Sequence, residues 1–301
     1  MKSPLIVDIK SNSWDDGRGI RSVVFFKGCP LNCVWCHNPE SRKPQAEVMY
    51  NSELCIGCGS CERKCSQQAI GFNKPGFIDR TNCNYCFDCI RECPSTALKR
   101  VGIEMSPDEI INRVLRDKPF LVNSSGGVTF SGGEPTLHLE FLSLLLKAFR
   151  EEGIHTLVET CGFFNFEPFS TKILPYTDAV YMDIKLFDAK AHEKYCGVKN
   201  DIILENFTKL AELSAIGRFE LLPRTPLVPG ITDTSDNLTA IAGFLAANKV
   251  KQAKLLEYNP LWLKKAGQLG LPNCQGLLET PQSVDQVQKC KKVFIDYGIT
   301  V

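Results

Sequence analysis

The segment RSVVFFKGCPLNCVWCHNPE (residues 21–40) joins the pattern of a buried strand directly to three closely spaced cysteines. The apolar, partly β-branched run at its start is typical of a strand that is covered on both faces. Cys29, Cys33 and Cys36 follow with the spacing C-x3-C-x2-C, and no fourth cysteine completes the group. A cubane cluster has four irons, so three thiolates leave one iron with an open position. The segment therefore predicts a strand that ends at an iron–sulfur cluster with one open iron.

Composition narrows the class of protein. The chain has 301 residues, of which 44% are hydrophobic and 23% charged, as expected of a globular protein. Its net charge of +1 gives no general attraction to nucleic acid or to an anionic membrane. Fifteen cysteines fit either a secreted disulfide scaffold or a reducing interior where thiolates bind metal. Residues 1–19 lack a signal-peptide core and no long apolar run follows, so we expect a cytoplasmic protein with reduced thiols.

Strand-like and helix-like segments alternate outside a cysteine-rich middle block. The expected strands are residues 21–27, 127–132, 154–160, 178–185, 218–224 and 252–258, and two of the helices between them are residues 137–153 and 237–249. This alternation predicts a parallel α/β sheet in the form of an open, partial (β/α)6 TIM-like barrel. We expect the barrel to comprise residues 1–45 and 105–301, with residues 46–104 inserted as a ferredoxin-like domain. In such folds the functional groups stand at the C-terminal ends of the strands.

The middle block contains the bacterial ferredoxin run C-x2-C-x2-C-x3-C twice. In ferredoxins the fourth cysteine of each run binds the cluster of the other run, which predicts two [4Fe-4S] clusters. The first auxiliary set is Cys55, Cys58, Cys61 and Cys93; the second auxiliary set is Cys83, Cys86, Cys89 and Cys65. Ser66 replaces the proline that usually follows the run, but this residue does not bind iron. The alternative is a pair of structural zinc sites, which would leave several of the eight thiols unused.

The three-cysteine spacing, with Trp35 before Cys36, resembles the signature of the radical S-adenosylmethionine (SAM) enzymes. In that superfamily the open iron binds the methionine part of SAM, and one electron splits the sulfonium to give a 5′-deoxyadenosyl radical. The segments SGGEP (131–135), ETCG (159–162) and YMDIK (181–185) each stand at the end of a predicted strand and match this resemblance. Trp35 is expected to form an aromatic wall beside the cluster.

The resemblance is closest to the activating enzymes of glycyl radical enzymes and covers nearly the whole chain. DGRGIRSVVFFKGCPLNCVWCHNPES, GVKNDIILEN and RTPLVPG carry it, together with the two-cluster insert. It implies an oxygen-sensitive oxidoreductase that removes a hydrogen from a glycine of a partner enzyme. It further implies three [4Fe-4S] clusters, flavodoxin or ferredoxin as electron donor, and a monomer. Neither nucleic acid nor a membrane is expected as a partner.

The same resemblance assigns roles to single residues. It implies a SAM site formed by Trp35, Gly132, Gly133, Glu134, Asp183, Lys185, Arg224 and, more weakly, Asn259, which stands where the pyruvate formate-lyase type has a histidine. Lys185 is also expected to take part in catalysis with the three cysteines. A monovalent cation, Na⁺ or K⁺, would be bound by Glu159, Thr160, Asp183 and the carbonyl of Tyr181. The family more often has Asp where Glu159 stands.

Two other functions fit parts of the sequence. Another radical SAM enzyme, acting on a small molecule or a peptide, would share the barrel, but such maturases usually carry further cysteines after it. Only Cys274 and Cys290 lie in that region. A plain electron carrier would need neither the barrel nor the three-cysteine site. Cys161, Cys196, Cys274 and Cys290 are interpreted as buried thiols, with Cys161 placed where it could line the active site.

Overall fold

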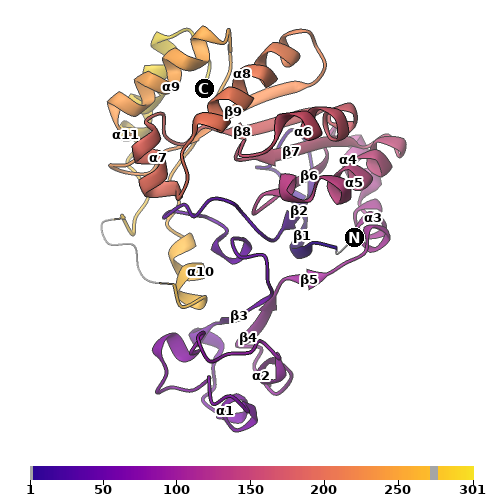
Figure 1. Cartoon of the computed structure of the whole chain (residues 1–301), viewed down its shortest axis with the longest axis vertical. Coiled ribbons are helices and arrows are strands. Elements are labelled where there is room, and N and C mark those ends of the chain that lie inside the picture. Colours follow the sequence, from indigo (N-terminus) through magenta and orange to yellow (C-terminus); the bar gives the residue numbers. More distant parts are fainter. Residues whose placement is uncertain (1–2, 272–276) are drawn as a thin grey trace.

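A mixed sheet of eight strands forms the centre of the larger body of the protein. A computed structural model describes residues 3–271 and 277–301, and the larger body stands above a smaller cysteine-rich one in Figure 1. The strands of the sheet run in the order β10-β9-β8-β7-β6-β2-β1-β5. Their bounds are β1 Leu5–Ser13, β2 Arg21–Phe26, β5 Ile103–Glu104, β6 Gly127–Gly132, β7 His155–Thr160, β8 Ala179–Asp183, β9 Glu220–Pro226 and β10 Lys254–Leu256.

The six strands from β2 to β10 are parallel, as the sequence predicts. Their ends differ from the predicted ones by a few residues at most. The sheet stays open between its outer strands, so the predicted partial barrel is confirmed. All six strands therefore end at the same edge of the sheet, and the cysteine loop of residues 28–36 also lies at that edge.

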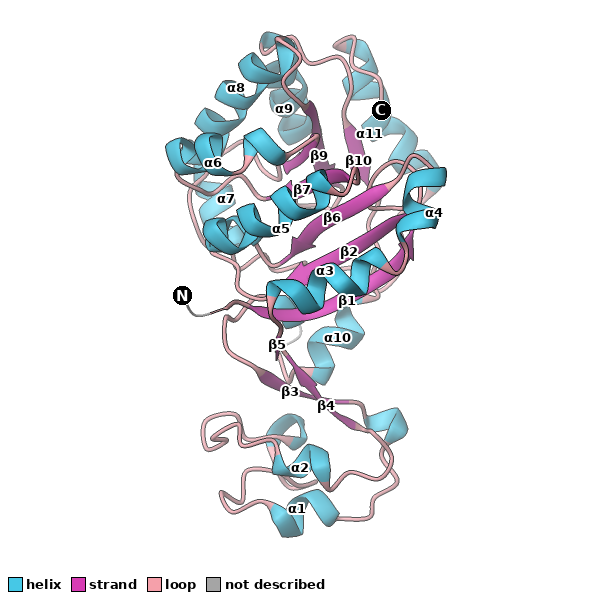
Figure 2. Ribbon diagram, turned by 90° about the vertical axis from the view of Figure 1, so that its right-hand side faces the viewer, coloured by secondary structure: helices cyan, strands magenta, loops and turns pink. Residues whose placement is uncertain are grey.

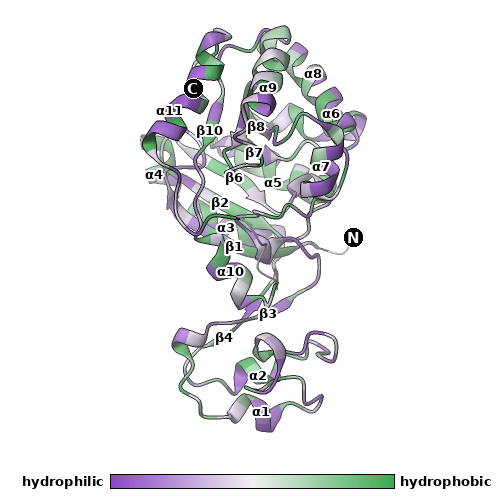
Figure 3. Ribbon diagram, turned by 90° about the vertical axis from the view of Figure 1, so that its left-hand side faces the viewer, coloured by the Kyte–Doolittle hydropathy of each residue, from purple (hydrophilic) through white to green (hydrophobic). Residues whose placement is uncertain are grey.

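Helices cover one face of the sheet. The helices of the main body are α3 Pro107–Leu115, α4 Lys118–Asn123, α5 Leu139–Glu151, α6 Phe166–Lys172, α7 Ala189–Cys196, α8 Asp201–Ala215, α9 Ser235–Ala247, α10 Trp262–Gln268 and α11 Val284–Asp296. Figure 2 shows α3 and α5 lying across the strands. The main hydrophobic core fills the space between these layers, and the central strands in Figure 3 are correspondingly hydrophobic.

Helix α3 begins with a side-chain cap. Ser106 caps this helix, and Glu109 returns a bond to the backbone N–H of Ser106, which forms a capping box. The predicted helix over 137–153 is shorter, because residues 135–138 form a 3-10 turn first. The antiparallel strands β1 and β5, the last two of the sheet on this side, were not predicted. The second half of β1 is polar and mostly exposed, which conceals it from a search for apolar runs.

The smaller body contains a two-stranded sheet and two short helices. They are β3 Glu47–Tyr50, β4 Leu98–Val101, α1 Ser60–Lys64 and α2 Asp88–Arg91. Its apolar core is small and consists of Val48, Ile70, Phe77, Ile78 and Leu98. α10 lies between the two bodies in Figure 1. The domain boundaries stay a prediction; β5, inside the range expected for the insert, pairs with β1 of the main sheet.

The described residues include no helix that combines the length and the apolar character needed to cross a bilayer.

Candidate active site

The three-cysteine loop (residues 28–36) leaves the C-terminal end of β2 and is fixed by backbone hydrogen bonds on two sides. The N–H of Gly28 donates to the carbonyl of Ser41 at 2.6 Å, and that of Asn32 donates to Cys196 at 2.7 Å. Gly28 has a φ of +104°, a conformation that favours glycine at this turn. The loop is therefore held between the segment that follows it and the end of α7.

All three predicted cysteines line one cavity, whose opposite wall is formed by α10 with Trp262 and Ala266. Burial, together with the neighbouring Cys33 and Cys29, raises the pKa of Cys36 to about 12. Three thiolates so close together repel one another unless a cationic group is bound between them. The donor set therefore fits a cluster whose irons are held by sulfur, as the sequence predicts.

Trp35 is buried and packs 6.5 Å from the ring of Tyr195, so it forms part of the wall behind this loop. Two thiols that bind no cluster in our interpretation also stand beside the loop. Cys196 stands next to Cys33, and Cys161 stands next to Cys29. Sequence reasoning found a place for Cys161 but missed that of Cys196, because no spacing signals a contact between α7 and the loop.

The Gly-Gly-Glu turn lies directly against the three-cysteine loop. The N–H of Glu134 donates to the carbonyl of Gly28 at 2.7 Å, and that of Gly133 donates to Phe26 at 2.8 Å. A Cβ on Gly133 would stand 2.1 Å from the same carbonyl of Gly28, so only glycine permits this approach. Gly132 has a φ of +107° at the end of β6. The two strand ends that the sequence singles out are thus adjacent in space.

The carboxylate of Glu134 is fully buried and accepts four hydrogen bonds. Oε1 accepts from the backbone and the hydroxyl of Thr136 at 3.2 and 2.7 Å and from the hydroxyl of Thr160 at 2.9 Å. Oε2 accepts from the N–H of Cys161 at 2.7 Å. The side chain thus joins the turn after β6 to the ETCG segment after β7. In this arrangement Glu134 positions the two turns, and its backbone faces the cysteine loop.

Charged side chains of alternating sign form a row across the ends of β7, β8 and β9. Lys185 Nζ lies 2.9 Å from Asp183 Oδ2, and Asp183 Oδ1 accepts from Arg224 Nε at 2.8 Å. Arg224 also pairs with Glu159, whose second oxygen accepts from the hydroxyl of Ser131 at 2.7 Å. We call Lys185, Asp183, Arg224 and Glu159 the charged row.

Mutual pairing keeps Asp183 and Lys185 ionised despite their burial. Burial alone raises the pKa of Asp183, but Arg224 and Lys185 outweigh it and hold that pKa below its ordinary value. Burial lowers the pKa of Lys185, whereas Asp183 and then Cys33 raise it, with a net increase. Lys185 therefore remains an ammonium group close to the three-cysteine loop.

The residues expected to bind a monovalent cation do not converge on one point. Glu159 and Asp183 both face the guanidinium of Arg224, which already supplies the positive charge between them. Thr160, the next residue along β7, points to the other face and donates to Glu134. The side chains therefore do not fit a cation site, and we derive no step from one.

Asn259 is likewise not brought to the site. Its side chain is exposed, and Oδ1 accepts from the N–H of Leu261 at 3.0 Å within its own turn. Cys290 is buried on α11, away from the loop, as expected of a simple buried thiol. Cys274 lies outside the described residues.

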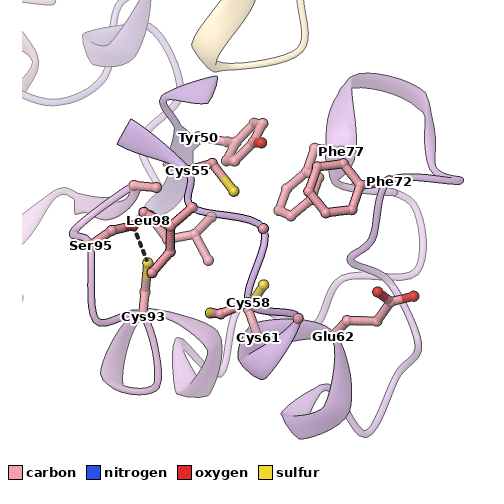
Figure 4. Close-up of a pocket in the computed structure, with 14 residues that line it drawn as sticks. Tyr50, Cys55, Cys58, Cys61, Glu62, Phe72, Phe77, Cys93, Ser95 and Leu98 are labelled. Atoms are coloured by element: carbon pink, nitrogen blue, oxygen red, sulfur yellow. Dashed lines mark hydrogen bonds between the residues drawn. The ribbon is translucent and has the colours of Figure 1, made fainter. Parts of the chain in front are cut away.

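The eight cysteines of the smaller body gather into two cavities with the crossed grouping that the sequence predicts. One cavity is lined by Cys55, Cys58, Cys61 and Cys93, and the other by Cys65, Cys83, Cys86 and Cys89. Figure 4 shows the thiols of the first auxiliary set around their cavity. In each set one cysteine is exposed and three are half-buried. Over residues 3–271 and 277–301, no three potential ligands stand close enough to hold a single metal ion, whereas a cluster separates its four sulfurs more widely.

Matches to protein families cover most of the chain. Residues 80–238 match the Radical SAM superfamily, residues 47–105 match a 4Fe-4S dicluster domain, and residues 15–69 match a 4Fe-4S single cluster domain. A crystal structure of a radical SAM methyltransferase from Sphaerobacter thermophilus shares the fold at 13% identity, with a TM-score of 0.51 over 99% of this chain and 76% of that one.

Relatives of similar length are activating enzymes. The chain is 36% identical over 313 residues to the indoleacetate decarboxylase activating enzyme of Tractidigestivibacter scatoligenes, which covers 98% of this chain and 95% of the relative. It is 38% identical to the (2S)-3-sulfopropanediol dehydratase activating enzyme of Klebsiella oxytoca, over 89% of this chain and 86% of the relative. The chain therefore belongs to the radical SAM superfamily and, within it, to the activating enzymes of glycyl radical enzymes.

Proposed function

We propose that Cys29, Cys33 and Cys36 bind the cluster at which this activating enzyme cleaves SAM. As in its family, SAM and the reduced cluster supply a 5′-deoxyadenosyl radical, which takes a hydrogen from a glycine of the partner enzyme. The single observation that carries the assignment is the convergence of three thiols on one cavity beside the Gly-Gly-Glu turn. The competing reading, a plain electron carrier, leaves this convergence and the charged row without a purpose.

The chain's own residues orient the cofactor in this proposal. The turn at Gly132 and Gly133 offers backbone groups to the amino group of SAM, because no side chain stands in the way. Lys185, held in place by Asp183, offers its ammonium to the carboxylate of SAM. Arg224 keeps Asp183 ionised and fixed, so that Lys185 is positioned before SAM arrives. The buried loop around Trp35 excludes solvent from the reacting centre.

We further propose that the first and second auxiliary sets each bind a [4Fe-4S] cluster, which makes three clusters in all. The crossed arrangement of the two cavities supports this assignment. Bound clusters would also stabilise a body whose apolar core has few residues. At least one of them relays electrons from a flavodoxin or ferredoxin in the cytoplasm, and the enzyme acts as a monomer on its partner.

The partner is a glycyl radical enzyme. Relatives of about equal identity serve an indoleacetate decarboxylase, a sulfopropanediol dehydratase and an isethionate sulfite-lyase. These partners share the glycine that is activated. We therefore assign to this chain the removal of a hydrogen from that glycine.

The assignment is tested by SAM cleavage in protein prepared without oxygen. The reduced, cluster-loaded chain and its Cys36→Ala and Cys290→Ala variants are incubated with SAM, and 5′-deoxyadenosine and methionine are quantified. We expect both products from the wild type and from Cys290→Ala, where a buried thiol far from the loop is changed, and none from Cys36→Ala. Full cleavage by Cys36→Ala with its site cluster absent would contradict the proposed role of the loop.

A further inference from the structure

The two halves of the ferredoxin-like body differ at the residues that surround their cysteines. The two runs have the same internal spacing, so each residue around one set has an equivalent in the other. Solvent exposure of the cysteines is matched between the sets, with one exposed thiol in each. Hydrogen bonds to the sulfurs and nearby charges also set the potential of a cluster. Any difference between the clusters must therefore come from these two factors.

Hydroxyl groups surround the first auxiliary set. Ser60 Oγ lies 3.6 Å from Cys58 Sγ, and Ser95 Oγ lies 3.7 Å from Cys93 Sγ. Tyr50 lines the same cavity, with its ring beside Cys55 in Figure 4. Each hydroxyl can donate to a cysteine sulfur once that sulfur is an iron-bound thiolate.

The equivalent positions around the second auxiliary set carry no hydroxyl. Counting from each run, Ile78 corresponds to Tyr50, Asp88 to Ser60, and Gln67 to Ser95. All three line the second cavity, and none of the residues found to line that cavity is a serine, threonine or tyrosine. One of the three replacements, Asp88, introduces a carboxylate.

The equivalent arginines strengthen this contrast. Arg63 donates to Ser60 Oγ at 3.0 Å and to the carbonyl of Cys58 at 3.0 Å. Ser60 Oγ accepts the hydrogen bond from the guanidinium with one of its lone pairs. Its own hydrogen is therefore available to donate to Cys58 Sγ. Arg91, the counterpart of Arg63, instead pairs with Asp88, so its charge is neutralised. Of these two equivalent arginines, Arg63 therefore supplies its charge at the first set, whereas the charge of Arg91 is balanced by Asp88.

One carboxylate also lines the first cavity. Glu62 belongs to α1, but Figure 4 shows its carboxylate directed away from the four sulfurs. Its Oε1 stands beside Gly71, 2.7 Å from where a Cβ on that residue would lie. This charge therefore does not offset the three hydroxyls.

We propose that the cluster bound by the first auxiliary set has the higher reduction potential of the two auxiliary clusters, because Ser60, Ser95, Tyr50 and Arg63 stabilise its reduced form. This inference rests on the proposed binding of two auxiliary clusters. An added electron makes the cluster and its sulfurs more negative, and hydroxyl donors and a guanidinium favour that state. An electron delivered to the smaller body then resides on the first cluster before it leaves for the site cluster.

The test is an anaerobic redox titration followed by electron paramagnetic resonance on the full-length, cluster-loaded protein. The site cluster is recognised by the change of its signal when SAM is added. Ser60→Ala and Ser95→Ala, singly and together, are compared with Ser66→Ala, a change at an exposed serine of the same body. We expect the double variant to lower the midpoint of the auxiliary cluster that is reduced first, with the second cluster and the Ser66→Ala protein unchanged.

The reciprocal change is expected to raise a midpoint potential, which misfolding would not do. Asp88→Ser introduces a hydroxyl at the equivalent position and frees Arg91, so the midpoint of the second auxiliary cluster should rise. Cys58→Ala and Cys86→Ala identify which signal belongs to which set. Unchanged midpoints in the double variant, or loss of the later-reduced signal in Cys58→Ala, would overturn the inference. Absence of two auxiliary signals from the wild type would instead overturn the proposed cluster content.

Discussion

Glu134 shows how one side chain can organise the site. The sequence suggests that it contacts SAM, whereas the structure uses both of its oxygens to hold the turns after β6 and β7 together. The row of Lys185, Asp183 and Arg224 is similarly interlocked, since each member holds the next in place. At the scale of single residues, then, much of the polar chemistry positions other groups.

We expect Glu134→Gln to destabilise the protein by about 1–3 kcal/mol. The amide NH₂ replaces a carboxylate oxygen that accepts hydrogen bonds, so a donor then faces another donor. The loss should be visible in urea unfolding of the cluster-loaded protein followed by circular dichroism without oxygen. Glu140→Gln is the control, because its pair with Lys172 is about half exposed and a change there costs at most about 0.5 kcal/mol. Equal stability of the two variants would contradict the structural role of Glu134.

Arg224→Met should cost about 3–5 kcal/mol near neutral pH, since it leaves Glu159 and Asp183 buried without the guanidinium. In the wild type the lowered pKa of Asp183 gives stability that is lost only when the pH falls through that value. In the variant only Lys185 still opposes the effect of burial on Asp183, so we expect the pKa of Asp183 to rise, and its protonation relieves the penalty at lower pH. Unfolding at pH 8 and pH 6 should therefore show a smaller deficit at pH 6, and a constant deficit would argue against the charged row.

Helix α10 shows how an element far along the chain supports the cysteine loop. Lys265 Nζ donates to the carbonyl of His37 at 3.0 Å and to Asn38 Oδ1 at 3.1 Å, and it pairs with Glu40 at 2.8 Å. These contacts fix the segment that directly follows Cys36. The element thus closes the cavity of the cluster from the side opposite to the strands.

Lys265→Met should make the segment after Cys36 less firmly fixed, so that the protein binds the site cluster more weakly. A hydrogen bond to a charged group contributes about 1.5–3 kcal/mol, and solvent partly screens the contacts of Lys265. We expect iron to leave the site cluster several-fold faster in the presence of a chelator. Lys264→Met is the matched control, since the adjacent lysine pairs only with the exposed Glu53. Identical rates of iron loss in the two variants would show that α10 does not support the loop in this way.

The whole molecule is joined at a buried ion pair between its two bodies. Lys27, at the end of β2, is fully buried and lies 3.0 Å from Glu47 at the start of β3. Its ammonium also donates to the carbonyl of Glu40 at 2.6 Å. The pair therefore connects the barrel, the loop after the cysteines and the smaller body at one point.

We expect Glu47→Gln to destabilise the protein by about 3–5 kcal/mol at pH 7, because Lys27 then keeps a buried charge without its partner. Burial lowers the pKa of Lys27 already, and Glu47 opposes that effect. Without Glu47 the pKa falls further, so the folded variant binds fewer protons than the unfolded chain and gains stability as pH rises. The deficit relative to wild type should shrink from pH 7 to pH 9. Glu92→Gln, which removes only an exposed pair with Lys64, should show neither effect.

The sequence by itself determined the parallel strands, the three-cysteine loop and the crossed pairing of the two ferredoxin runs. Apolar runs and cysteine spacings are local patterns, and ligation by closely spaced thiols requires little beyond the turn that carries them. The tertiary structure alone decided that Glu134 joins two turns, that Arg224 stands between Glu159 and Asp183, and that Lys27 meets Glu47. These contacts link strands far apart in the chain, and whether a buried charge binds a ligand or another side chain depends on what folding places beside it.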